Sequence, residues 1–519
     1  MKRIHPIFLM FLLFLMSFRA NAQAPVEKHH VKFQNITLAE AFDSLAQIYR
    51  VNFSYNARLP DLKRIVSMDQ DGTLLEILQQ LLGATSLGYD ILGRQVVIYP
   101  VVSLPASGSV FIAPDSVILI RGKVYNYQQE PLAYASVGLY GRSIVTVTNT
   151  DGVFLLKIPY THRRDTLVVT YLGYQPLRIA LDTFSGGELK LQLREAPVEL
   201  SPVWVRSISA SSIVEQVIRN ISNNYYQQNA MYSAFYREII RDEDDYLSVI
   251  EALVDIAKAP YSSWLLNDQA KIFKGHRSQA IKQLQAFSFK LEGGVYNAVR
   301  IDLIKDPPLF LSREGFPDYV YRLEGKIAFN DRMLYIIRFE PSRRIAEMSY
   351  EGVLYVDDKT YALAAATFNL TSQGVEYAQH LLVKKVPRKT QVKLQEANYM
   401  VFYRPENNRW YLEYTSLELK LKAKSRNFFY NSTITTRSEL VVTRTDTTNH
   451  SRFRWNEIVR SGDILADKIQ AYHDDYWENY NVIVPEQPLI EAINKLGGSQ
   501  VNDTKESTSL WRIIFSGKK

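Results

Sequence analysis

The chain of 519 residues contains no cysteine. Disulfides, thiolate zinc sites, cysteine nucleophiles and the lipid-accepting thiol of conventional bacterial lipoproteins are therefore excluded. The sequence also lacks the His-Glu-x-x-His, Gly-x-Ser-x-Gly, phosphate-loop and dinucleotide-binding patterns of common enzymes. These absences favour a protein that is not an enzyme and that holds no cofactor and no metal.

Long hydrophobic runs are missing from the chain beyond its N-terminus. Lys2 and Arg3 precede an apolar stretch from Ile7 to Phe18, and Ala20-Asn21-Ala22 has the small-x-small pattern of a cleavage site. The stretch is shorter than the roughly 20 residues needed to span a bilayer. Residues 1–22 are thus predicted to be a signal peptide. We expect the mature chain in the periplasm, free or associated with the outer membrane, without a transmembrane span.

The charge is mildly basic, with a formal net value of +7 from 61 basic and 54 acidic side chains. The sequence shows no dense basic run, so nucleic acid is not an expected partner. Weak attraction to an anionic membrane surface stays open. The 33 tyrosines and 24 phenylalanines favour sheet-rich structure, and a chain of this length predicts several domains.

A pair of matched segments marks the first module, residues 29–100. Thr37-Leu38-Ala39-Glu40 and Thr73-Leu74-Leu75-Glu76 each fit a capping box, and apolar residues follow both at helical spacing. Short β-like stretches flank each helix, which predicts a small βαβ-repeat module. The module resembles the secretin and TonB short N-terminal domain in the run Phe33 to Phe42, in Val51-Asn52-Phe53-Ser54-Tyr55 and in Gly88-Tyr89-Asp90-Ile91. This resemblance implies a periplasmic domain that docks a partner protein.

Residues 101–116 are predicted to be a linker, because they are rich in Val, Ser, Pro and Ala without a helical period. Residues 117–195 contain short strands at regular spacing with turn signals between them, which predicts a β-sandwich. Four segments resemble the carboxypeptidase-regulatory-like domain: Arg121-Gly122-Lys123-Val124, Glu130-Pro131-Leu132, Asn149-Thr150-Asp151-Gly152-Val153-Phe154 and Val169-Thr170-Tyr171-Leu172-Gly173-Tyr174. The resemblance implies a non-catalytic, prealbumin-like sandwich of the kind found in Bacteroidetes-type exported proteins.

Residues 203–519 are predicted to form a large, curved antiparallel sheet closed by helices. Long alternating stretches are joined by turn signals at Asn330-Asp331 and Asp357-Asp358-Lys359. Helices are expected near Ile213 to Ile221, over Ile464 to Trp477, and from Pro488 to Leu496. Any open face of the sheet is expected to be apolar or aromatic.

Two further resemblances concern the same large domain. The segment from Tyr350 to Leu370, with its strand, acidic turn and strand, resembles the half-barrels of lipoprotein carrier proteins. The runs Tyr476-Trp477 and Tyr480-Asn481-Val482-Ile483 resemble uncharacterised Bacteroidetes proteins that carry the same regulatory-like domain. The first resemblance implies a concave sheet that could hold a lipid or a lipoprotein.

Four polar groups are candidate sites, and each has a simpler structural interpretation. His29-His30 has no further ligands nearby, and Asp69-Gln70-Asp71-Gly72 lacks the later acid of a calcium loop. Asp357-Asp358 is expected to lie in a tight turn, with both carboxylates in water at ordinary pKa. The run from Arg241 to Asp245 is expected to be a solvated hairpin turn. No catalytic, cofactor-binding or metal-ligating residue is therefore assigned.

Aromatic residues cluster at Tyr225-Tyr226, Trp410-Tyr411 and Phe428-Phe429-Tyr430, where they could pack a large sheet or line a ligand groove. We expect a non-enzymatic accessory or binding protein whose first module docks a protein partner. A carrier of lipid or lipoprotein and a hydrolase with an unrecognised site stay open. A carrier predicts an apolar groove, and a hydrolase predicts a cleft where histidine and carboxylates converge.

Overall fold

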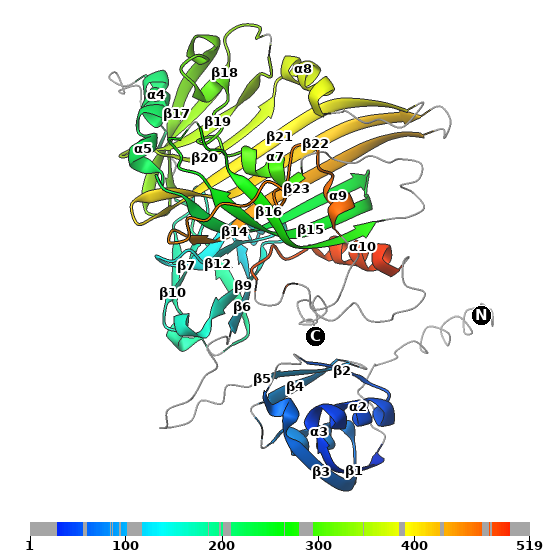
Figure 1. The fold of residues 1–519 in the computed structure, drawn as a ribbon. Helices are drawn as coiled ribbons and strands as arrows, with labels where there is room; N and C mark the ends of the chain where they lie inside the picture. Colours follow the sequence, from blue (N-terminus) through cyan, green and yellow to red (C-terminus); the bar gives the residue numbers. More distant parts are fainter. Residues whose placement is uncertain are drawn as a thin grey trace, which may run out of the picture. The chain divides into compact units, whose positions relative to one another are not determined.

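Figure 1 shows the computed structural model, whose internal contacts divide the chain into two compact units, residues 1–112 and 113–519. The structure describes residues 28–498 apart from internal gaps. These gaps are residues 56–59, 84, 86, 93–94, 101–116, 185, 197–198, 201–208, 264, 280–293, 346, 383–389, 426–429, 470–476 and 478–479. The predicted signal peptide (residues 1–22) and linker (residues 101–116) lie outside the described residues.

The first unit has the strand–helix–strand order that the repeated pattern predicts. Its elements are β1 (His29–Thr37), α2 (Leu38–Tyr49), β2 (Asn52–Ser54), β3 (Ile65–Gly72), α3 (Leu74–Leu82), β4 (Leu87–Leu92) and β5 (Gln95–Pro100). β1 pairs with β3 in an antiparallel ladder, and β2, β5 and β4 form a second sheet. The first strand of each repeat thus pairs with its counterpart in the other repeat.

Both predicted capping boxes are present. The N–H of Thr37 donates to Glu40 Oε2 at 2.8 Å, and the N–H of Glu40 donates to Thr37 Oγ1 at 3.3 Å. Thr73 and Glu76 repeat these bonds at 2.8 and 3.4 Å. Each box satisfies backbone donors that the first turn of a helix leaves free. The apolar stripes behind the boxes meet in one core, which includes Val31, Leu38, Phe42, Leu45, Leu74, Leu78, Leu81 and Val96.

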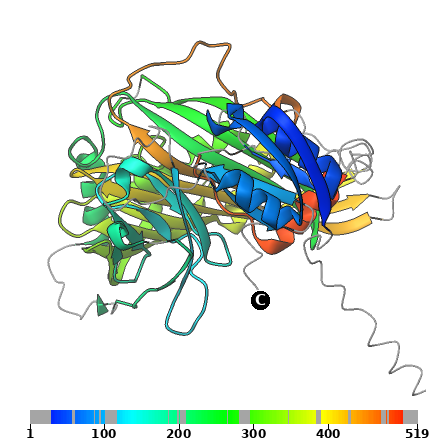
Figure 2. The same ribbon diagram turned by 90° about the horizontal axis from the view of Figure 1, so that it is seen from below.

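The second unit begins with the predicted β-sandwich, seen in cyan in Figure 2. Its strands are β6 (Val117–Tyr125), β7 (Ser136–Leu139), β8 (Val145–Val147), β9 (Val153–Pro159), β10 (Thr166–Thr170), β11 (Leu177–Ala180) and β12 (Glu188–Gln192). β11, β10, β7 and β8 form one sheet, and β12, β6 and β9 form the other. Gly152 has φ +74°, and Asn149 Oδ1 accepts from the N–H groups of Asp151 and Val153. The turn predicted here is therefore confirmed.

The large domain is built on an 11-stranded sheet. Its strands are β13 (Glu199–Leu200), β14 (Ala230–Asp242), β15 (Asp245–Lys258), β16 (Gln269–Gln279), β17 (Tyr319–Phe329), β18 (Arg332–Pro341), β19 (Tyr350–Asp357), β20 (Leu363–Leu370), β21 (Thr390–Glu406), β22 (Arg409–Ser425) and β23 (Tyr430–Asp446). The sheet runs in the order β13, β17 to β23, β14, β15, β16, and every neighbouring pair is antiparallel. Asn330 and Asp331 both have positive φ, as tight hairpin turns require.

Helices and irregular segments cover the sheet (Figure 1). They are α4 (Ala210–Arg219), α5 (Ile221–Asn224), α7 (Gly294–Arg300), α8 (Ser372–Leu382), α9 (Leu465–Lys468) and α10 (Gln487–Gly498). We call the face that packs against α4, α5 and α7 the inner face, and its core includes Val217, Val295 and Leu440. The opposite, outer face packs against α10, residues 480–484 and the sandwich. None of the described helices has the length and apolar character that crossing a bilayer requires.

One of the two helices expected in the C-terminal part needs correction. The helix predicted from Ile464 to Trp477 is present only as α9, and residues 470–476 lie outside the described residues. Leu465 packs at the inner face, whereas the Trp477 ring meets Phe235 at 5.4 Å on the outer face. One amphipathic helix cannot serve two faces of a sheet, so the helical spacing was misleading. The helix predicted from Pro488 to Leu496 is confirmed as α10.

Candidate functional site

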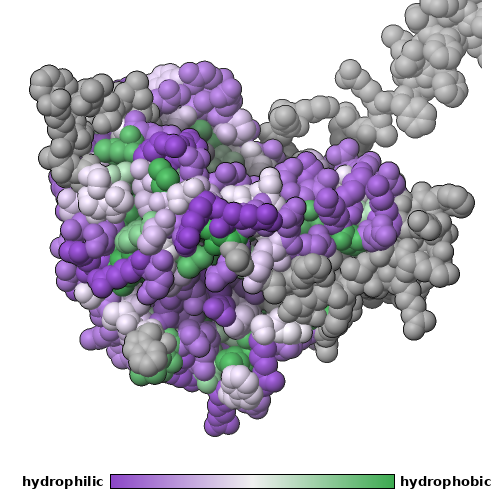
Figure 3. Space-filling model, turned by 90° about the horizontal axis from the view of Figure 1, so that it is seen from above, coloured by the Kyte–Doolittle hydropathy of each residue, from purple (hydrophilic) through white to green (hydrophobic). Residues whose placement is uncertain are grey.

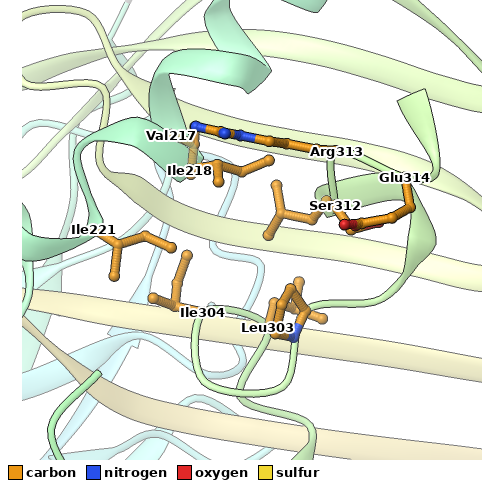
Figure 4. Close-up of a pocket in the computed structure, with 10 residues that line it drawn as sticks. Val217, Ile218, Ile221, Leu303, Ile304, Ser312, Arg313 and Glu314 are labelled. Carbon is orange, nitrogen blue, oxygen red and sulfur yellow. The ribbon is translucent and has the colours of Figure 1, made fainter. Parts of the chain in front are cut away.

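A cavity of about 220 Å³ lies at the inner face, between α4 and the segment 303–314. Figure 4 shows its lining side chains. They are Val217, Ile218, Ile221, Leu303, Ile304, Pro307, Leu311, Ser312, Arg313 and Glu314. The first seven are apolar, and the last three gather at one end of the segment. The cavity is smaller than the roughly 300–1,000 Å³ of typical small-molecule sites. It has room for only a portion of a ligand, such as a stretch of an acyl chain.

The first wall of the cavity comes from the stripe of α4. Ser209 caps this helix by accepting from the N–H of Ser212 at 3.1 Å. Ile213, Val214 and Val217 are fully buried in the inner core. Ile218 lies beside that stripe and stays partly exposed, as does Ile221 one turn on. The wall is therefore made by the edge of the stripe that the sheet does not cover.

The second wall is the irregular segment 303–314, which is fixed at both ends. At its start, the N–H of Ile304 donates to Asp302 Oδ1 at 3.2 Å and to the Tyr403 hydroxyl at 3.2 Å. At its end, a Cβ atom on Gly315 would collide with the backbone carbonyl of Leu309, so this turn requires glycine. The wall is held in place although it has little regular structure.

A buried ionic cluster anchors this segment to the sheet. Lys258 Nζ donates to Asp268 Oδ2 at 2.6 Å and to Asp302 Oδ2 at 2.7 Å. The Tyr403 hydroxyl donates to the other oxygen of Asp302 at 2.8 Å. Burial lowers the pKa of Lys258, but the two carboxylates outweigh burial and raise it overall. Burial, with Asp302 nearby, raises the pKa of Tyr403. Lys258 is held by both carboxylates and Asp302 also accepts from Tyr403, so the cluster positions the wall.

The rim of the cavity carries the polar side chains. Arg313 and Glu314 are exposed, and Figure 4 shows the Arg313 side chain extending toward Val217 on α4. The Ser312 hydroxyl donates to the Leu309 carbonyl and accepts from the N–H of Gly315, both at 3.2 Å. The lining residues include no histidine. Ser312 therefore stabilises its own turn, and the cavity lining places no histidine beside it.

The outer face holds the one arrangement within the described residues that resembles a hydrolytic site, and its geometry does not fit. Ser278 Oγ lies 3.2 Å from His276 Nε2, and His276 Nδ1 lies 3.8 Å from Glu251 Oε2. A distance of 3.8 Å is too long for the carboxylate–imidazole hydrogen bond of a catalytic triad. Arg237 donates to Glu251 Oε1 at 2.8 Å, and Ser278 is only 4 % exposed. The group is a buried ionic network without an accessible nucleophile.

The structure brings two of the predicted polar candidates together. His30 Nδ1 lies 2.9 Å from Asp71 Oδ1, and His30 Nε2 lies 3.2 Å from Asp69 Oδ1, across the β1–β3 ladder. Lys32 also donates to Asp69 at 2.6 Å. All four side chains are exposed. Among the described residues, no group of three or more histidine and carboxylate side chains could hold a metal ion.

The acidic turn differs from its prediction. Asp357 is fully buried, and its Oδ1 accepts from the N–H and the hydroxyl of Thr360 at 2.7 and 2.8 Å. Burial raises its pKa, but these bonds and Arg332 outweigh burial and lower it overall. Asp358 pairs with Lys326 at 2.7 Å. The expectation that both carboxylates point to water is wrong. Asp357 accepts hydrogen bonds within its own turn, and Asp358 forms an ion pair with Lys326. The hairpin expected at residues 241–245 is present: Asp242 pairs with Asp245 at the ends of β14 and β15, and Glu243 and Asp244 form the turn between them.

The aromatic clusters are mostly core. Tyr225 is fully buried and donates to the Leu363 carbonyl at 2.9 Å, and Trp410 and Tyr411 are buried in the same core. Phe428 and Phe429 lie outside the described residues.

Of the two cavity walls, the sequence predicted the apolar stripe of α4 but not the segment 303–314. The only signal there is the short apolar run Pro307-Pro308-Leu309-Phe310-Leu311.

The comparisons with known proteins concern parts of the chain. Residues 120–205 match the model of the CarboxypepD_reg-like domain family, which confirms the resemblance of the sandwich. No curated protein sequence matches the chain. The carboxypeptidase-regulatory-like part is thus the one family assignment that the sequence comparison supports.

Three solved structures are similar to about half of the chain. A DUF1329 family protein from Desulfovibrio piger has 10% identity and a TM-score of 0.22, covering 47% of this chain and 95% of its own. An outer membrane lipoprotein-sorting protein domain from Vibrio parahaemolyticus has 10% identity and a TM-score of 0.21, covering 48% and 96%. A LolA superfamily protein from Nitrosomonas europaea has 11% identity and a TM-score of 0.18, covering 49% and 98%. These scores are too low to assign a fold or a ligand to this chain.

Proposed function

We propose that the chain is a non-enzymatic binding protein of the cell envelope, and that its large domain holds an apolar ligand in the cavity beneath α4. The observation that carries this proposal is the composition of the cavity wall, which has seven apolar residues, with Ser312, Arg313 and Glu314 at the rim. Burying an apolar chain against such a wall is favourable by about 25 cal/mol per Å². A ligand with an acyl chain matches the apolar wall, and Arg313 is the rim group that an anionic end would contact.

The first experiment measures binding of anilinonaphthalene sulfonate, an apolar anionic dye, and its displacement by oleate. Ile218→Trp places a large side chain in the cavity, and we expect it to weaken dye binding about tenfold or more, because each 1.4 kcal/mol of lost burial is a tenfold change. Leu265→Trp is the matched control, since Leu265 is 70% exposed and does not line the cavity. Equal affinity in the two variants would contradict the proposal.

A second experiment on the same cavity tests whether Arg313 at its rim selects ligands with an anionic end. Arg313→Gln should weaken displacement by oleate more than displacement by an uncharged alcohol of the same chain length. The reason is that only the carboxylate gains from the exposed guanidinium. An identical loss for both compounds would show that Arg313 does not select an anionic end.

For the first unit, we propose the role that its resemblance to the secretin and TonB short N-terminal domain implies, which is docking of a periplasmic protein in a Bacteroidetes-type exported chain. Its separate core and its two capping boxes support a module that folds independently. Deleting residues 29–100 from the exported chain should abolish cross-linking to that partner and leave dye binding unchanged. Loss of dye binding in the deletion variant would assign the unit a structural role instead.

A further inference from the structure

The outer face of the long strands is strongly basic at one end. Lys420, Lys422 and Lys424 alternate with Leu421 and Ala423 along β22, so the three lysines share one face. Lys393 on β21 is the direct cross-strand partner of Lys422. We call Lys393, Lys420, Lys422 and Lys424 the lysine face. The expectation that an open face would be apolar or aromatic is therefore wrong here.

The lysine face is open, although the opposite side of the same strands is packed. Leu394, Leu421 and Ala423 point to the inner side, where they are buried in a core with Ala378 of α8. Lys393, Lys420 and Lys424 are exposed, and Lys422 is partly exposed. Ser136 and Ser143 of the sandwich reach this sheet at Glu413 and Glu406, close to the other end of β22 and β21. The basic end of the outer face is thus free of described residues.

The positive charge on this face is largely uncompensated. Lys420 pairs with Glu396 at 3.2 Å. Across the described part of the chain, Lys393, Lys422 and Lys424 form no ion pair. Like charges directly opposite each other destabilise a sheet, so the pair of Lys393 and Lys422 opposes folding stability. A partner that supplies negative charge would relieve this repulsion.

The chain itself does not offer an acidic partner for the face at its C-terminal end. Residues 499–519 contain Asp503 and Glu506 against Lys505, Arg512, Lys518 and Lys519, so their net charge is positive. Exposed apolar side chains elsewhere, such as Trp455 and Leu265, are scattered, and Figure 3 shows hydrophobic residues as small separate spots on the molecular face that it draws. Charge complementarity therefore calls for an anionic partner.

We propose that the lysine face docks the protein on an anionic lipid surface. Four lysines on two adjacent extended strands present ammonium groups on flexible stems in one layer, which suits a layer of phosphate headgroups. Their described neighbours on β23, Thr433 and Thr435, are small and polar, so these strand positions offer no aromatic platform on which nucleic-acid bases could stack. This inference goes beyond the proposed ligand site, which lies at the inner face.

The experiment uses the exported full chain and measures its sedimentation with vesicles of phosphatidylcholine that contain phosphatidylglycerol or lack it. We expect binding only to the anionic vesicles, and a decrease when salt is raised. Lys393→Gln/Lys422→Gln/Lys424→Gln should reduce the partition coefficient on the order of a hundredfold, since each lysine near an anionic surface contributes roughly fivefold.

Lys123→Gln/Lys190→Gln is the matched control, because these two lysines are also cross-strand partners, on the sandwich. It should leave vesicle binding within about twofold of the unchanged chain. Dye binding in the cavity should be the same in all three proteins, which separates this test from that of the ligand site. Absence of binding to anionic vesicles, an equal loss in the control, or capture of heparin but not of vesicles would each overturn the proposal.

Discussion

Glu238 illustrates how burial sets the behaviour of a single residue. Its side chain is buried on β14 and accepts a hydrogen bond from the Tyr236 hydroxyl at 2.9 Å. Burial raises its pKa from 4.5 to about 7, and the one hydrogen bond lowers it only in part. The folded protein therefore keeps a proton on this carboxyl group at pH values where the unfolded chain has released it.

The first prediction follows from this difference in proton binding. The raised pKa makes a stability contribution that is fully present below about pH 4.5 and is lost as the pH rises to about 7. The loss should be about 3 kcal/mol. Glu238→Gln cannot titrate, so the difference in unfolding free energy between variant and unchanged chain should shift by this amount between pH 4.5 and pH 8. Parallel pH profiles in chemical denaturation would contradict the assignment.

The second prediction concerns Lys258, which is buried between Asp268 and Asp302. Lys258→Met leaves two carboxylates buried without their cation, and we expect the free energy of unfolding to fall by about 3–5 kcal/mol. The control is Lys420→Met, which breaks an exposed pair with Glu396 and should cost under about 1 kcal/mol. Denaturant titrations compare the two. A small effect of Lys258→Met would mean that the cluster does not anchor the cavity wall.

At the scale of elements, the two capping boxes supply the third prediction. Thr37→Ala and Thr73→Ala each remove the hydroxyl that accepts from the third residue of the helix, and each should cost about 1 kcal/mol. The segment 23–100 should fold by itself, because its core is its own. Ser44→Ala is the control: Ser44 is partly exposed and donates to the Glu40 carbonyl within α2. Thermal unfolding of the segment should rank the threonine variants below the control.

At the scale of the whole second unit, a short segment joins the sandwich to the large sheet. Asn481 Oδ1 accepts from the N–H of Lys157 at 2.7 Å, and its Nδ2 donates to the Lys157 carbonyl at 3.1 Å. The Thr146 hydroxyl donates to the Val482 carbonyl at 3.2 Å. Val147, Leu155, Phe235 and Val441 share one core with Val482, Ile483 and Val484 of this segment. The sandwich and the sheet are thus continuous through the segment 480–484.

The fourth prediction tests that continuity. Asn481→Ala leaves the N–H and carbonyl groups of Lys157 buried without these bonds, and we expect a cost of about 2–3 kcal/mol. The sandwich should then lose its coupling to the sheet, so that calorimetry of the variant shows an earlier transition before the main one. Asn398→Ala, at an exposed position of β21, should change stability by less than about 0.5 kcal/mol. A single unshifted transition in Asn481→Ala would refute the coupling.

Features that depend on near neighbours could be predicted from the amino-acid sequence alone. The capping boxes, the stripe of α4 and the turns at Asn149 and Asn330 follow from spacings of one to four residues, where backbone geometry leaves few choices. The regulatory-like sandwich was likewise evident from local strand and turn signals. Asp357 is the exception among the turns, since its burial depends on what packs over it.

Which distant groups meet, and which faces stay open, became clear only in the folded chain. The cavity lies between α4 and a segment about 90 residues further along the sequence. Lys258 forms an ion pair with Asp302, which is 44 residues away in the sequence. The alternation of Lys420, Lys422 and Lys424 with apolar residues predicts a strand with one basic and one apolar face. The pattern does not say whether the basic face meets solvent or a partner. The packing of α8 on the other side settles which side chains are buried. Burial is a property of the assembled chain, because it depends on residues that the local pattern does not contain.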